Sequence, residues 1–414
     1  MLDIRFIREN ADFVQESARR KGYQVVIQDL LDSDLGRRDL QLRVETLRER
    51  RNEIANEMKG GKPSGDLVAE GRRIKLELVE LEGQLRAVDE QYTQLLWSVP
   101  NVIFDDVPDG GEEDSVEIKQ VGEKRANAID HLEFATSRGW LDFERGAKVA
   151  GAKFYYLKGD LALLENAITQ FALHKVIGKG FDFMTVPHMV NQRTMTGTGF
   201  APRSSDQSDE YALEGEDLSL IATAEISLTG YHADEIIDEN KLPLLYAGYS
   251  PCYRREAGAA GKHTRGLFRV HQFNKLEMYA FTTKEQSRNV HEQLLAIEEE
   301  IWQELGIPYH VINIAAGDLG APAAKKYDIE YWSPVDTMYR ELTSCSNCTD
   351  FQARNLNIRV RRNDGSVEVL HTLNGTAVSL ARSLVAIIEN YQTPDGKLAI
   401  PAVLRQYMGG REVM

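Results

Sequence analysis

Charged and aromatic side chains alternate along one short stretch of this chain, from Phe268 to Glu277, and a second charged stretch, from Tyr253 to Glu256, precedes it. This pattern predicts two strands, because alternate side chains of a strand share one face. The shared face would present Arg254 and Glu256 from the first strand, and Arg269, His271, Phe273, Lys275 and Glu277 from the second. Such a face is a poor surface for packing, but it suits a ligand with phosphates, a flat base and an ammonium group.

The two predicted strands are joined by the segment from Ala257 to Leu267, which is too long for a tight hairpin turn. Its glycines, Gly258, Gly261 and Gly266, favour a loop. We expect no catalytic role for His263 in this loop or for His271 beside it, since a loop histidine is usually solvated and His271 can orient its neighbours.

The bulk composition indicates a globular protein of two or three domains, with 414 residues of which 42% are hydrophobic. The sequence has neither a long apolar run nor a signal-peptide pattern, so we expect no membrane span and a cytoplasmic location. Three cysteines suit a reducing compartment. The net charge of −15 argues against generic nucleic-acid binding, so any such contact needs a local basic patch.

Residues from about 37 to 99 carry apolar side chains at alternating spacings of three and four, which predicts two helices in an antiparallel coiled coil. Each helix of about 30 residues would be about 45 Å long. The glycine-rich stretch 60–65 predicts the turn between them, and Pro100 and Asn101 end the second helix. The seam is broken at Arg51 alone, and its residues are Leu40, Val44, Leu47, Ile54 and Met58, then Ile74, Leu78, Leu81, Leu85, Val88, Tyr92, Leu95 and Val99.

The two halves of this arm differ in charge. From Arg37 to Lys62 there are eight basic and five acidic residues, whereas Asp66 to Glu90 has four basic and seven acidic ones. The basic half could meet a phosphate backbone, or its cations could be paired flanks of the coiled coil; charge alone favours the paired flanks.

A polar, acidic connector at 104–115 predicts an interdomain linker. From residue 116 onward, helix-like stretches (164–177, 284–305, 376–391) alternate irregularly with short strand-like runs such as 183–186 and 356–360. This arrangement predicts an α+β domain, with an antiparallel sheet flanked by helices.

Three separate segments resemble the motifs of class II aminoacyl-tRNA synthetases, and specifically those of the seryl-tRNA synthetase family, bacterial type. Residues 180–187 resemble motif 1, residues 253–277 motif 2, and residues 374–382 motif 3. The segments Thr223-Ala224-Glu225 and Glu341 to Cys348 are similar to further parts of the family, and the N-terminal arm resembles its tRNA-binding domain. The resemblance covers nearly the whole chain, in the family's order.

The resemblance implies a division into a tRNA-binding domain at 1–103 with the arm at about 37–99, a linker at 104–115, and a catalytic domain at 116–414. It implies ATP-dependent activation of L-serine to seryl-adenylate and transfer to the 3′ end of tRNA(Ser), and also of tRNA(Sec). A cytoplasmic homodimer is expected, with Pro187 at the interface. The apolar face of the preceding helix is expected in the same region (Leu164, Ala167, Ile168, Phe171, Ala172 and Val176).

By the same resemblance, the catalytic arginines are Arg254, Arg269 and Arg382. Arg254 would hold the α-phosphate of ATP and Arg382 the γ-phosphate, since a guanidinium pairs well with phosphate oxygens. Phe273 would stack on the adenine, close to Glu256. Apolar neighbours surround Arg382, so an internal salt bridge is an equal alternative for it. The ATP-binding residues are Arg254, Arg255, Glu256, Phe273, Glu341, Leu342, Thr343, Ser344 and Arg382.

The implied serine-binding residues are Thr223, Ala224, Glu225, Glu277 and Thr376. Glu277 would pair with the ammonium group, and Thr376 would touch the hydroxyl. Glu341 and Ser344 would lie beside Mg²⁺ carried with ATP, because oxygen ligands suit that cation. No zinc is expected at Cys345 and Cys348, since Cys252 is the remaining cysteine and zinc normally needs four ligands.

Two other functions fit parts of the sequence. A synthetase homologue could load a carrier protein with a small amino acid, but the long arm argues against it. A non-enzymatic coiled-coil module with a decayed catalytic domain is disfavoured because Arg254, Glu256, Glu277 and Arg382 are all present.

Overall fold

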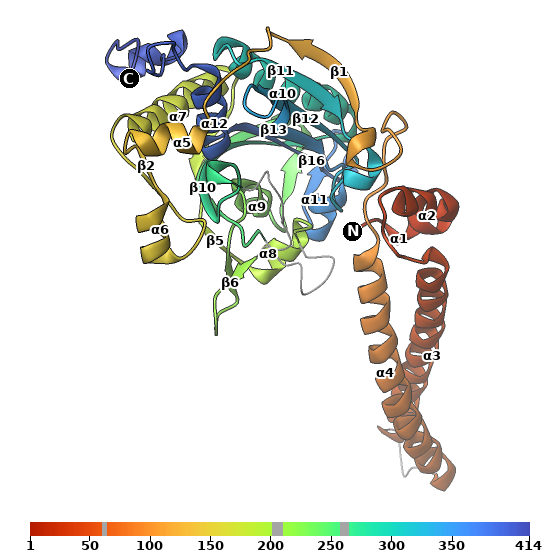
Figure 1. Cartoon of the computed structure of the whole chain (residues 1–414). Helices are drawn as coiled ribbons and strands as arrows, with labels where there is room; N and C mark the ends of the chain where they lie inside the picture. Colours follow the sequence, from red (N-terminus) through yellow and green to blue (C-terminus); the bar gives the residue numbers. More distant parts are fainter. Residues whose placement is uncertain (60–63, 201–209, 257–264) are drawn as a thin grey trace. The chain divides into compact units, whose positions relative to one another are not determined.

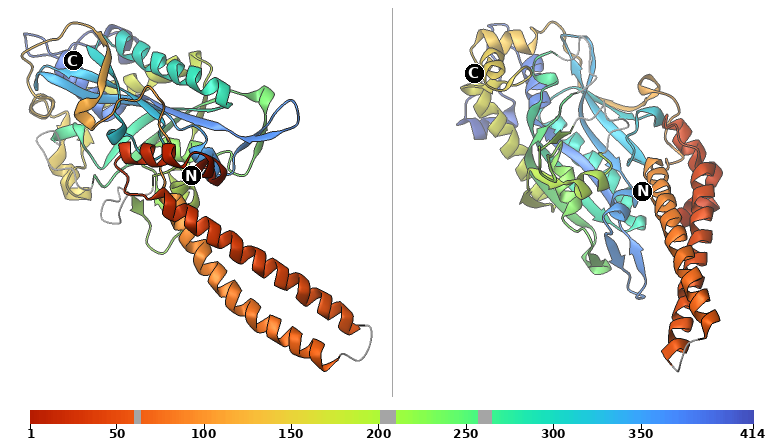
Figure 2. Two further views of the ribbon diagram at one scale, coloured as in Figure 1. Left: turned by 90° about the vertical axis from the view of Figure 1, so that its right-hand side faces the viewer. Right: turned by 90° about the horizontal axis from the view of Figure 1, so that it is seen from below.

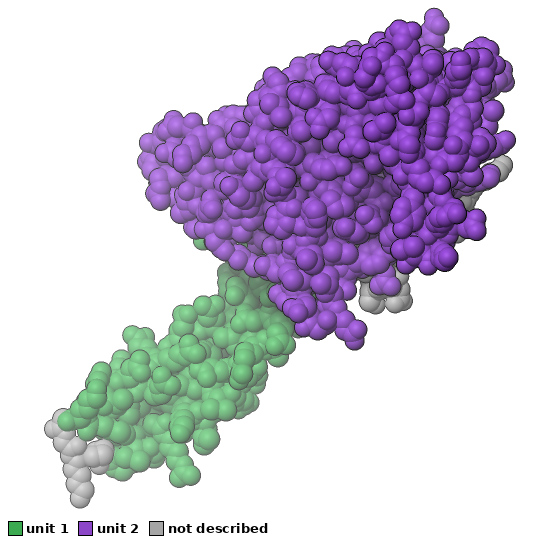
Figure 3. Space-filling model, turned by 90° about the vertical axis from the view of Figure 1, so that its left-hand side faces the viewer, with its two compact units in different colours: residues 1–102 green, residues 103–414 purple. Residues whose placement is uncertain are grey.

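The computed structural model describes residues 1–59, 64–200, 210–256 and 265–414. They form two compact units, Met1–Val102 and Ile103–Met414, which Figure 3 shows in different colours. Among the helices of these described residues, none has both the length and the apolar composition needed to cross a membrane.

Two long helices make up most of the smaller unit (Figures 1 and 2). Helix α3 covers Ile27–Lys59 and α4 covers Gly65–Ser98, with 33 and 34 residues. The predicted antiparallel pair is confirmed, and α4 ends just before Pro100 as expected. Most of the predicted turn lies outside the described residues. The apolar side chains buried between the helices are Val44, Ile54, Ile74, Leu78 and Leu81.

Helix α3 begins at Ile27 rather than near residue 37, because its first turns pack with the short helices α1 (Ile4–Glu9) and α2 (Ala11–Arg20). Ile27 and Leu30 are buried there. Asp34 is buried too and accepts two hydrogen bonds of 2.9 Å from the Arg8 guanidinium. This bidentate pair between Arg8 and the buried Asp34 holds the first turns of α3 in place.

The cations of α3 divide into two groups. Arg48 pairs with Glu82 at 2.8 Å and Arg50 with Glu70 at 2.9 Å, so part of the basic half consists of paired flanks. Arg43 and Arg51 are exposed and make no ion pair with any residue that the structure describes. These two cations remain available to an anionic partner.

An eight-stranded sheet lies at the centre of the larger unit (Figure 1). Adjacent strands are antiparallel except β9 and β4, which are parallel, so the predicted α+β architecture is confirmed. In spatial order the strands are β1 (Val116–Val121), β11 (Tyr309–Asn313), β12 (Lys325–Ser333), β13 (Met338–Asn347), β16 (His371–Ser379), β10 (Gln272–Thr282), β9 (Leu244–Tyr253) and β4 (Asp182–Thr185).

This sheet shares a large apolar core with α7 (Asp160–Gly178), α10 (Lys284–Glu304) and α12 (Leu380–Asn390), which all contact it. The helices expected at 164–177 and 284–305 are found as α7 and α10. The segment 104–115 also belongs to the larger unit, since Val107 packs with Ile314 and the Phe104 amide donates to the Ala324 carbonyl at 3.0 Å.

The apolar face of α7 lies inside this core. Leu164, Ala167, Ile168, Phe171, Ala172 and Val176 are all buried within the chain itself. The expectation that these six side chains meet a second copy is therefore wrong, because the chain's own core already covers them. The large apolar residues that α7 exposes are different ones, Leu163 and Ile177.

Two predicted element boundaries near the C-terminus are also wrong. Residues 376–379 are the end of strand β16, and α12 begins only at Leu380. Pairing with β10 overrides the helix-like spacing at residues 376–379. The strand expected at 356–360 starts at Arg359 as β14, because Phe351–Asn355 form the short helix α11 just before it.

The remaining elements are short and surround the sheet. The helices are α5 (His131–Ser137), α6 (Phe143–Ala150), α8 (Gln192–Gly197) and α9 (Ala224–Gly230). Three small sheets are formed by β2 (Leu141–Asp142) with β3 (Tyr156–Leu157); by β5 (Met189–Asn191), β7 (Leu218–Leu220) and β6 (Tyr211–Ala212); and by β15 (Val367–Val369), β14 (Arg359–Arg361) and β8 (Ile236–Asp238).

Candidate active site

Strands β9 and β10 are the two strands predicted from the sequence, but both are shorter at the connecting end. β9 ends at Tyr253 and β10 begins at Gln272. Arg254 continues the pairing by one step, because its amide donates to the His271 carbonyl at 3.0 Å. Glu256 then adopts a positive φ of 50°, which ends extended pairing. Arg254, Glu256, Arg269 and His271 therefore lie beyond the strands, and residues 257–264 lie outside the described part of the chain.

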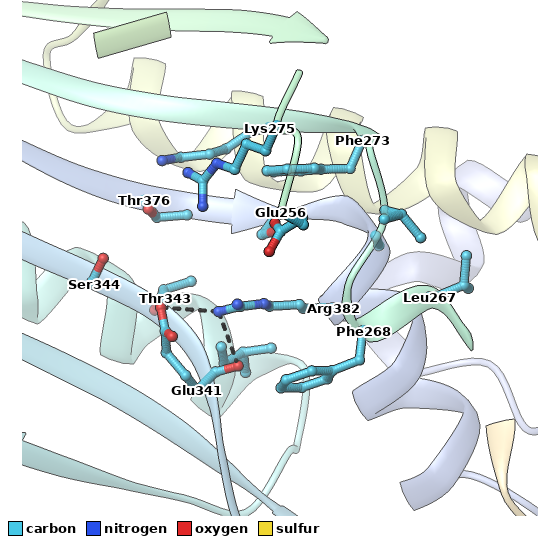
Figure 4. A pocket seen from close by; sticks show the side chains of 15 residues that line it. Glu256, Leu267, Phe268, Phe273, Lys275, Glu341, Thr343, Ser344, Thr376 and Arg382 are labelled. Carbon is cyan, nitrogen blue, oxygen red and sulfur yellow. Dashed lines mark hydrogen bonds and ion pairs between the residues drawn. The ribbon is translucent and has the colours of Figure 1, made fainter. Parts of the chain in front are cut away.

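The β9 and β10 ends open into a cavity of about 120 Å³. It brings Arg254 and Arg382 together, although 128 positions separate them in the sequence. In Figure 4, Phe273 and Lys275 lie on one side, Arg382 and Glu341 on the other, and Glu256 between them. The lining residues are Arg254, Glu256, Leu267, Phe268, Val270, Phe273, Lys275, Glu341, Leu342, Thr343, Ser344, Thr376, Ser379, Ala381 and Arg382.

Arg382 makes the internal ion pair that was the alternative for it, and it lines the cavity as well. Its Nη1 lies 2.9 Å from a Glu341 carboxylate oxygen, and its guanidinium lies 5.0 Å from the centre of the Phe268 ring. Desolvation raises the pKa of Glu341, but the charges of Arg382 and Lys326 outweigh it and lower the pKa to about 2. Glu341 is therefore a carboxylate at any physiological pH.

Arg254 is oriented by the main chain and by an aromatic ring. Its Nε donates to the Ala222 carbonyl at 3.3 Å, and its guanidinium lies 5.3 Å from the centre of the Phe273 ring. Glu256 is held by an ion pair, because its carboxylate lies 3.0 Å from the Nε of Arg269. Arg269 thus reaches the cavity through Glu256 and is not itself one of the lining residues.

A cluster of buried polar side chains adjoins the cavity through Lys275. Glu277 is 1% exposed and accepts a hydrogen bond of 3.0 Å from the Thr223 hydroxyl. The Lys275 ammonium contacts the Glu277 carboxylate and donates to the Thr223 hydroxyl at 3.1 Å. Burial raises the pKa of Glu277, although Lys275 opposes the rise. Thr376 stands directly opposite Glu277 in the β10–β16 pair.

Glu225 lies in the first turn of α9, which Thr223 caps, and it is the second acid of this buried cluster. Its Oε1 accepts hydrogen bonds from the Gln352 amide at 2.8 Å and the Asn374 amide at 2.9 Å. Burial, with the nearby charge of Glu277, raises the pKa of Glu225 to about 7. Ala224 is buried beside it and presents no polar side chain.

The turn that carries Phe268 is a short 3₁₀ helix, Gly266–Phe268. His131 supports it from below: its Nε2 accepts the Leu267 amide at 3.3 Å, and its Nδ1 lies 3.1 Å from Glu389. Gly266 has φ of +64°, and a Cβ atom there would lie 2.3 Å from the His131 ring. Only glycine therefore fits at position 266.

Several predicted residues lie away from the cavity wall. The Arg255 guanidinium lies 5.9 Å from the Tyr211 ring centre, and Arg255 is not among the lining residues. Pro187 follows β4, and its carbonyl accepts the Ser227 hydroxyl at 2.7 Å. Thr223, Glu225 and Glu277 are buried behind the wall. Cys345 and Cys348 are buried thiols in the core.

Sequence reasoning gave no role to four residues that the structure brings to the site. Two of them could have been found in the sequence: strand alternation placed Lys275 on the same face as Phe273 and Glu277, and Asn374 lies in the segment 374–382 that resembles motif 3. His131 and Gln352 could not, because their contacts bridge distant segments: His131 reaches Leu267, and Gln352 reaches Glu225.

The chain is similar to known proteins over its whole length. Residues 1–103 match the seryl-tRNA synthetase N-terminal domain, and residues 210–391 match the tRNA synthetase class II core domain (G, H, P, S and T). The serine–tRNA ligase of Dictyoglomus turgidum is 44% identical over 424 residues, covering 100% of this chain and 99% of that protein. The serine–tRNA ligase of Methanocella arvoryzae is 44% identical over 427 residues, covering 100% of both.

The crystal structure of seryl-tRNA synthetase from Pyrococcus horikoshii complexed with ATP has a TM-score of 0.91 and 40% identity, covering 100% of this chain and 99% of that one. The antiparallel sheet, its cavity and these matches define a class II aminoacyl-tRNA synthetase. Within that class, the chain belongs to the seryl-tRNA synthetase family. The bacterial type stays a prediction, because the relatives include an archaeal one of equal identity.

Proposed function

We propose that the protein uses ATP to activate L-serine as seryl-adenylate and transfers the seryl group to the 3′ end of tRNA(Ser), and also to that of tRNA(Sec). The observation that carries this proposal is the cavity that holds Arg254 and Arg382 beside the Glu277–Thr376 pair. One end of the site is suited to a triphosphate, and the adjoining pocket is suited to an ammonium group and a hydroxyl.

ATP would bind with its adenine on Phe273 and its phosphates toward the arginines. Arg254 would contact the α-phosphate and stabilise the charge that develops when the serine carboxylate attacks it. Arg382 would contact the γ-phosphate and Arg269 would also contact phosphate, while Glu256 would lie near the adenine. No side chain has to act as a nucleophile, since positioning of the two anions and neutralisation of their charge supply the catalysis.

Serine would bind with its ammonium group between Glu277 and Glu225, beside Thr223, and with its hydroxyl at Thr376. A site that hydrogen-bonds a hydroxyl can reject an analogue without one by roughly 10⁴–10⁵. Alanine would be excluded in this way, and threonine by size. Lys275 would neutralise Glu277 when no ammonium group is present.

The cavity wall has oxygen ligands suited to Mg²⁺. Glu341 offers a carboxylate, and Ser344 offers a hydroxyl. One carboxylate plus substrate phosphates is a common way for proteins to hold this ion. When bound with ATP, Mg²⁺ would offset phosphate charge next to Glu341 and Ser344.

Serine-dependent ATP–pyrophosphate exchange tests activation, and aminoacylation of tRNA(Ser) tests transfer. We expect exchange with serine alone among the standard amino acids, and charging of tRNA(Ser). Absence of serine-dependent exchange would contradict the proposal. A parallel assay with carrier proteins separates it from the carrier-loading alternative. Three reduced, buried cysteines support a cytoplasmic location for this activity.

Serine binding is expected to weaken as the pH falls below about 7, because Glu225 then takes up a proton and no longer attracts the ammonium group. The charged neighbours of Glu225 are Glu277, Lys275 and Arg254. Glu277 raises the pKa of Glu225, whereas Lys275 and Arg254 lower it. The serine KM in the exchange assay should rise up to roughly tenfold per pH unit on the acidic side.

The matched variant Glu225→Gln should bind serine less tightly, and its serine KM should not change with pH over the same pH range. The folded protein also binds one extra proton between pH 4.5 and about 7, so this group makes the free energy of unfolding fall as the pH rises through that window. A wild-type serine KM that does not change between about pH 6 and about pH 8 would contradict this assignment of Glu225.

We also propose a homodimer, built on residues other than the buried face of α7. β4 is the edge strand of the sheet, and its Phe183 is 41% exposed. Leu163 and Ile177 of α7 are exposed as well, at 52% and 47%. A second copy could pair with the edge strand and would cover these exposed apolar side chains.

Sedimentation at micromolar concentration is expected to give twice the chain mass of 46.7 kDa. The variant Phe183→Asp should sediment as a monomer, because it places a charge in the centre of the proposed contact. A control substitution at an exposed position of another element, Val367→Asp, should leave the dimer intact. A wild-type protein that sediments as a monomer would contradict the dimer.

A further inference from the structure

Gln352, in the short helix α11, is fully buried and has every hydrogen-bonding position of its amide occupied. Its Nε2 donates to the Thr198 carbonyl at 3.0 Å and to Glu225 Oε1 at 2.8 Å. Its Oε1 accepts from the Tyr279 hydroxyl at 2.9 Å and from the Thr372 hydroxyl at 2.7 Å. No other amide orientation fits, because a backbone carbonyl can only accept a hydrogen bond.

This amide has a direct effect on Glu225. Oε1 of Glu225 accepts hydrogen bonds from the side-chain amides of Gln352 and Asn374, and these two bonds fix the orientation of the carboxylate. The second oxygen, Oε2, is then the one left for the amino-acid pocket. A carboxylate buried without such donors would be free to rotate or would stay protonated.

We propose that Gln352 is a positioning residue for amino-acid selection: it fixes Glu225 in the serine pocket and ties it to the main chain at Thr198. The inference rests on the proposed serine activation. Gln352 is not among the residues that line the cavity, and it would act on the amino acid through its hydrogen bond to Glu225. Its removal should change the binding of the amino acid and leave the binding of ATP unchanged.

The test measures serine-dependent ATP–pyrophosphate exchange with the full-length variants Gln352→Glu and Gln352→Met. Gln352→Glu keeps the size but sets an acceptor against the Thr198 carbonyl and the Glu225 carboxylate, while Gln352→Met keeps the length and removes every hydrogen bond. We expect the serine KM to rise roughly tenfold to a hundredfold, as for a buried partner left unsatisfied. The KM for ATP should stay within about twofold, and the preference for serine over alanine and threonine should fall.

Asn355 provides a matched control on the same helix. Its Nδ2 donates to the Gly197 carbonyl at 2.7 Å, so it ties α11 to the residue next to Thr198. Asn355→Ala should leave the serine KM within about threefold. An equal rise in Asn355→Ala, or equal rises in the KM for serine and ATP, would mean general loosening of α11 and would overturn the proposal.

A milder variant keeps the proposal testable if the two Gln352 variants do not fold. Thr372→Val removes one donor to Gln352 Oε1 and leaves the amide nitrogen in place. We expect a rise of a few-fold in the serine KM alone. An unchanged serine KM in a folded Gln352 or Thr372 variant, with normal wild-type exchange, overturns the role of Gln352. Absence of serine-dependent exchange in the wild type would instead overturn the proposed function.

Discussion

Replacing Arg254 by alanine is expected to lower serine-dependent ATP–pyrophosphate exchange by roughly two to three orders of magnitude. Arg254 is held at the cavity wall by the Ala222 carbonyl and the Phe273 ring, so its charge is already in place before a nucleotide arrives. Such preorganised charge is worth most in the transition state, where the negative charge at phosphorus increases. The loss should therefore fall mainly on kcat, with the thermal unfolding temperature little changed.

Arg255 is the matched comparison, because it is the same residue type one position along. Its guanidinium lies over Tyr211, outside the cavity wall. Arg255→Ala should lower exchange by less than about tenfold. If the two variants were equally impaired, a general requirement for positive charge would replace the specific role of Arg254. Near-normal exchange in Arg254→Ala would contradict the proposed site.

Shortening the helical arm is expected to abolish charging of tRNA(Ser) while activation of serine continues. Residues 41–84, which include the exposed Arg43 and Arg51, would be replaced by a short glycine–serine turn. Contacts to phosphates supply much of the affinity of proteins for nucleic acids, so kcat/KM for tRNA should fall by roughly a thousandfold or more. Exchange should stay within about threefold, because all lining residues of the cavity belong to the larger unit.

The full-length double variant Arg43→Ala, Arg51→Ala separates loss of charge from loss of the arm. Its tRNA KM should rise, and the dependence of that KM on salt should become shallower, while the serine KM stays constant. Arg48→Ala is the control, since Arg48 is paired with Glu82. Normal tRNA charging by the shortened protein would contradict a role of the arm in tRNA binding.

The helix pair and the face of β10 were predictable from the sequence because each depends on a local period. Val44, Ile54, Ile74 and Leu78 repeat at heptad spacing, and Phe273, Lys275 and Glu277 alternate along one strand. Such patterns depend on backbone geometry alone, so they can be read without knowing the neighbouring elements.

The errors arose where distant segments decide the outcome. Thr376 and Val378 lie in a strand rather than a helix because they pair with Glu277 and Leu276 of β10. The apolar face of α7 suggested a contact between copies, but α12, the segment 402–408 and the sheet of the same chain cover it. The contacts of His131 and Gln352 could not be predicted for the same reason, since their partners Leu267 and Glu225 lie 136 and 127 positions away.

Glu277 and Thr376 face each other across two adjacent strands, and on both strands the next side chain along is a buried apolar one. One additional amino acid inserted in either strand would turn the polar side chain into the core and the apolar one toward the substrate. The register already shifts by one residue between Leu276 and Glu277, where Ala377 is the extra residue of β16, so a further change in the length of either strand would displace Glu277 relative to Thr376. Under the proposed function, changes in the separate unit Met1–Val102 would alter contact with a tRNA and leave this pair of side chains in place.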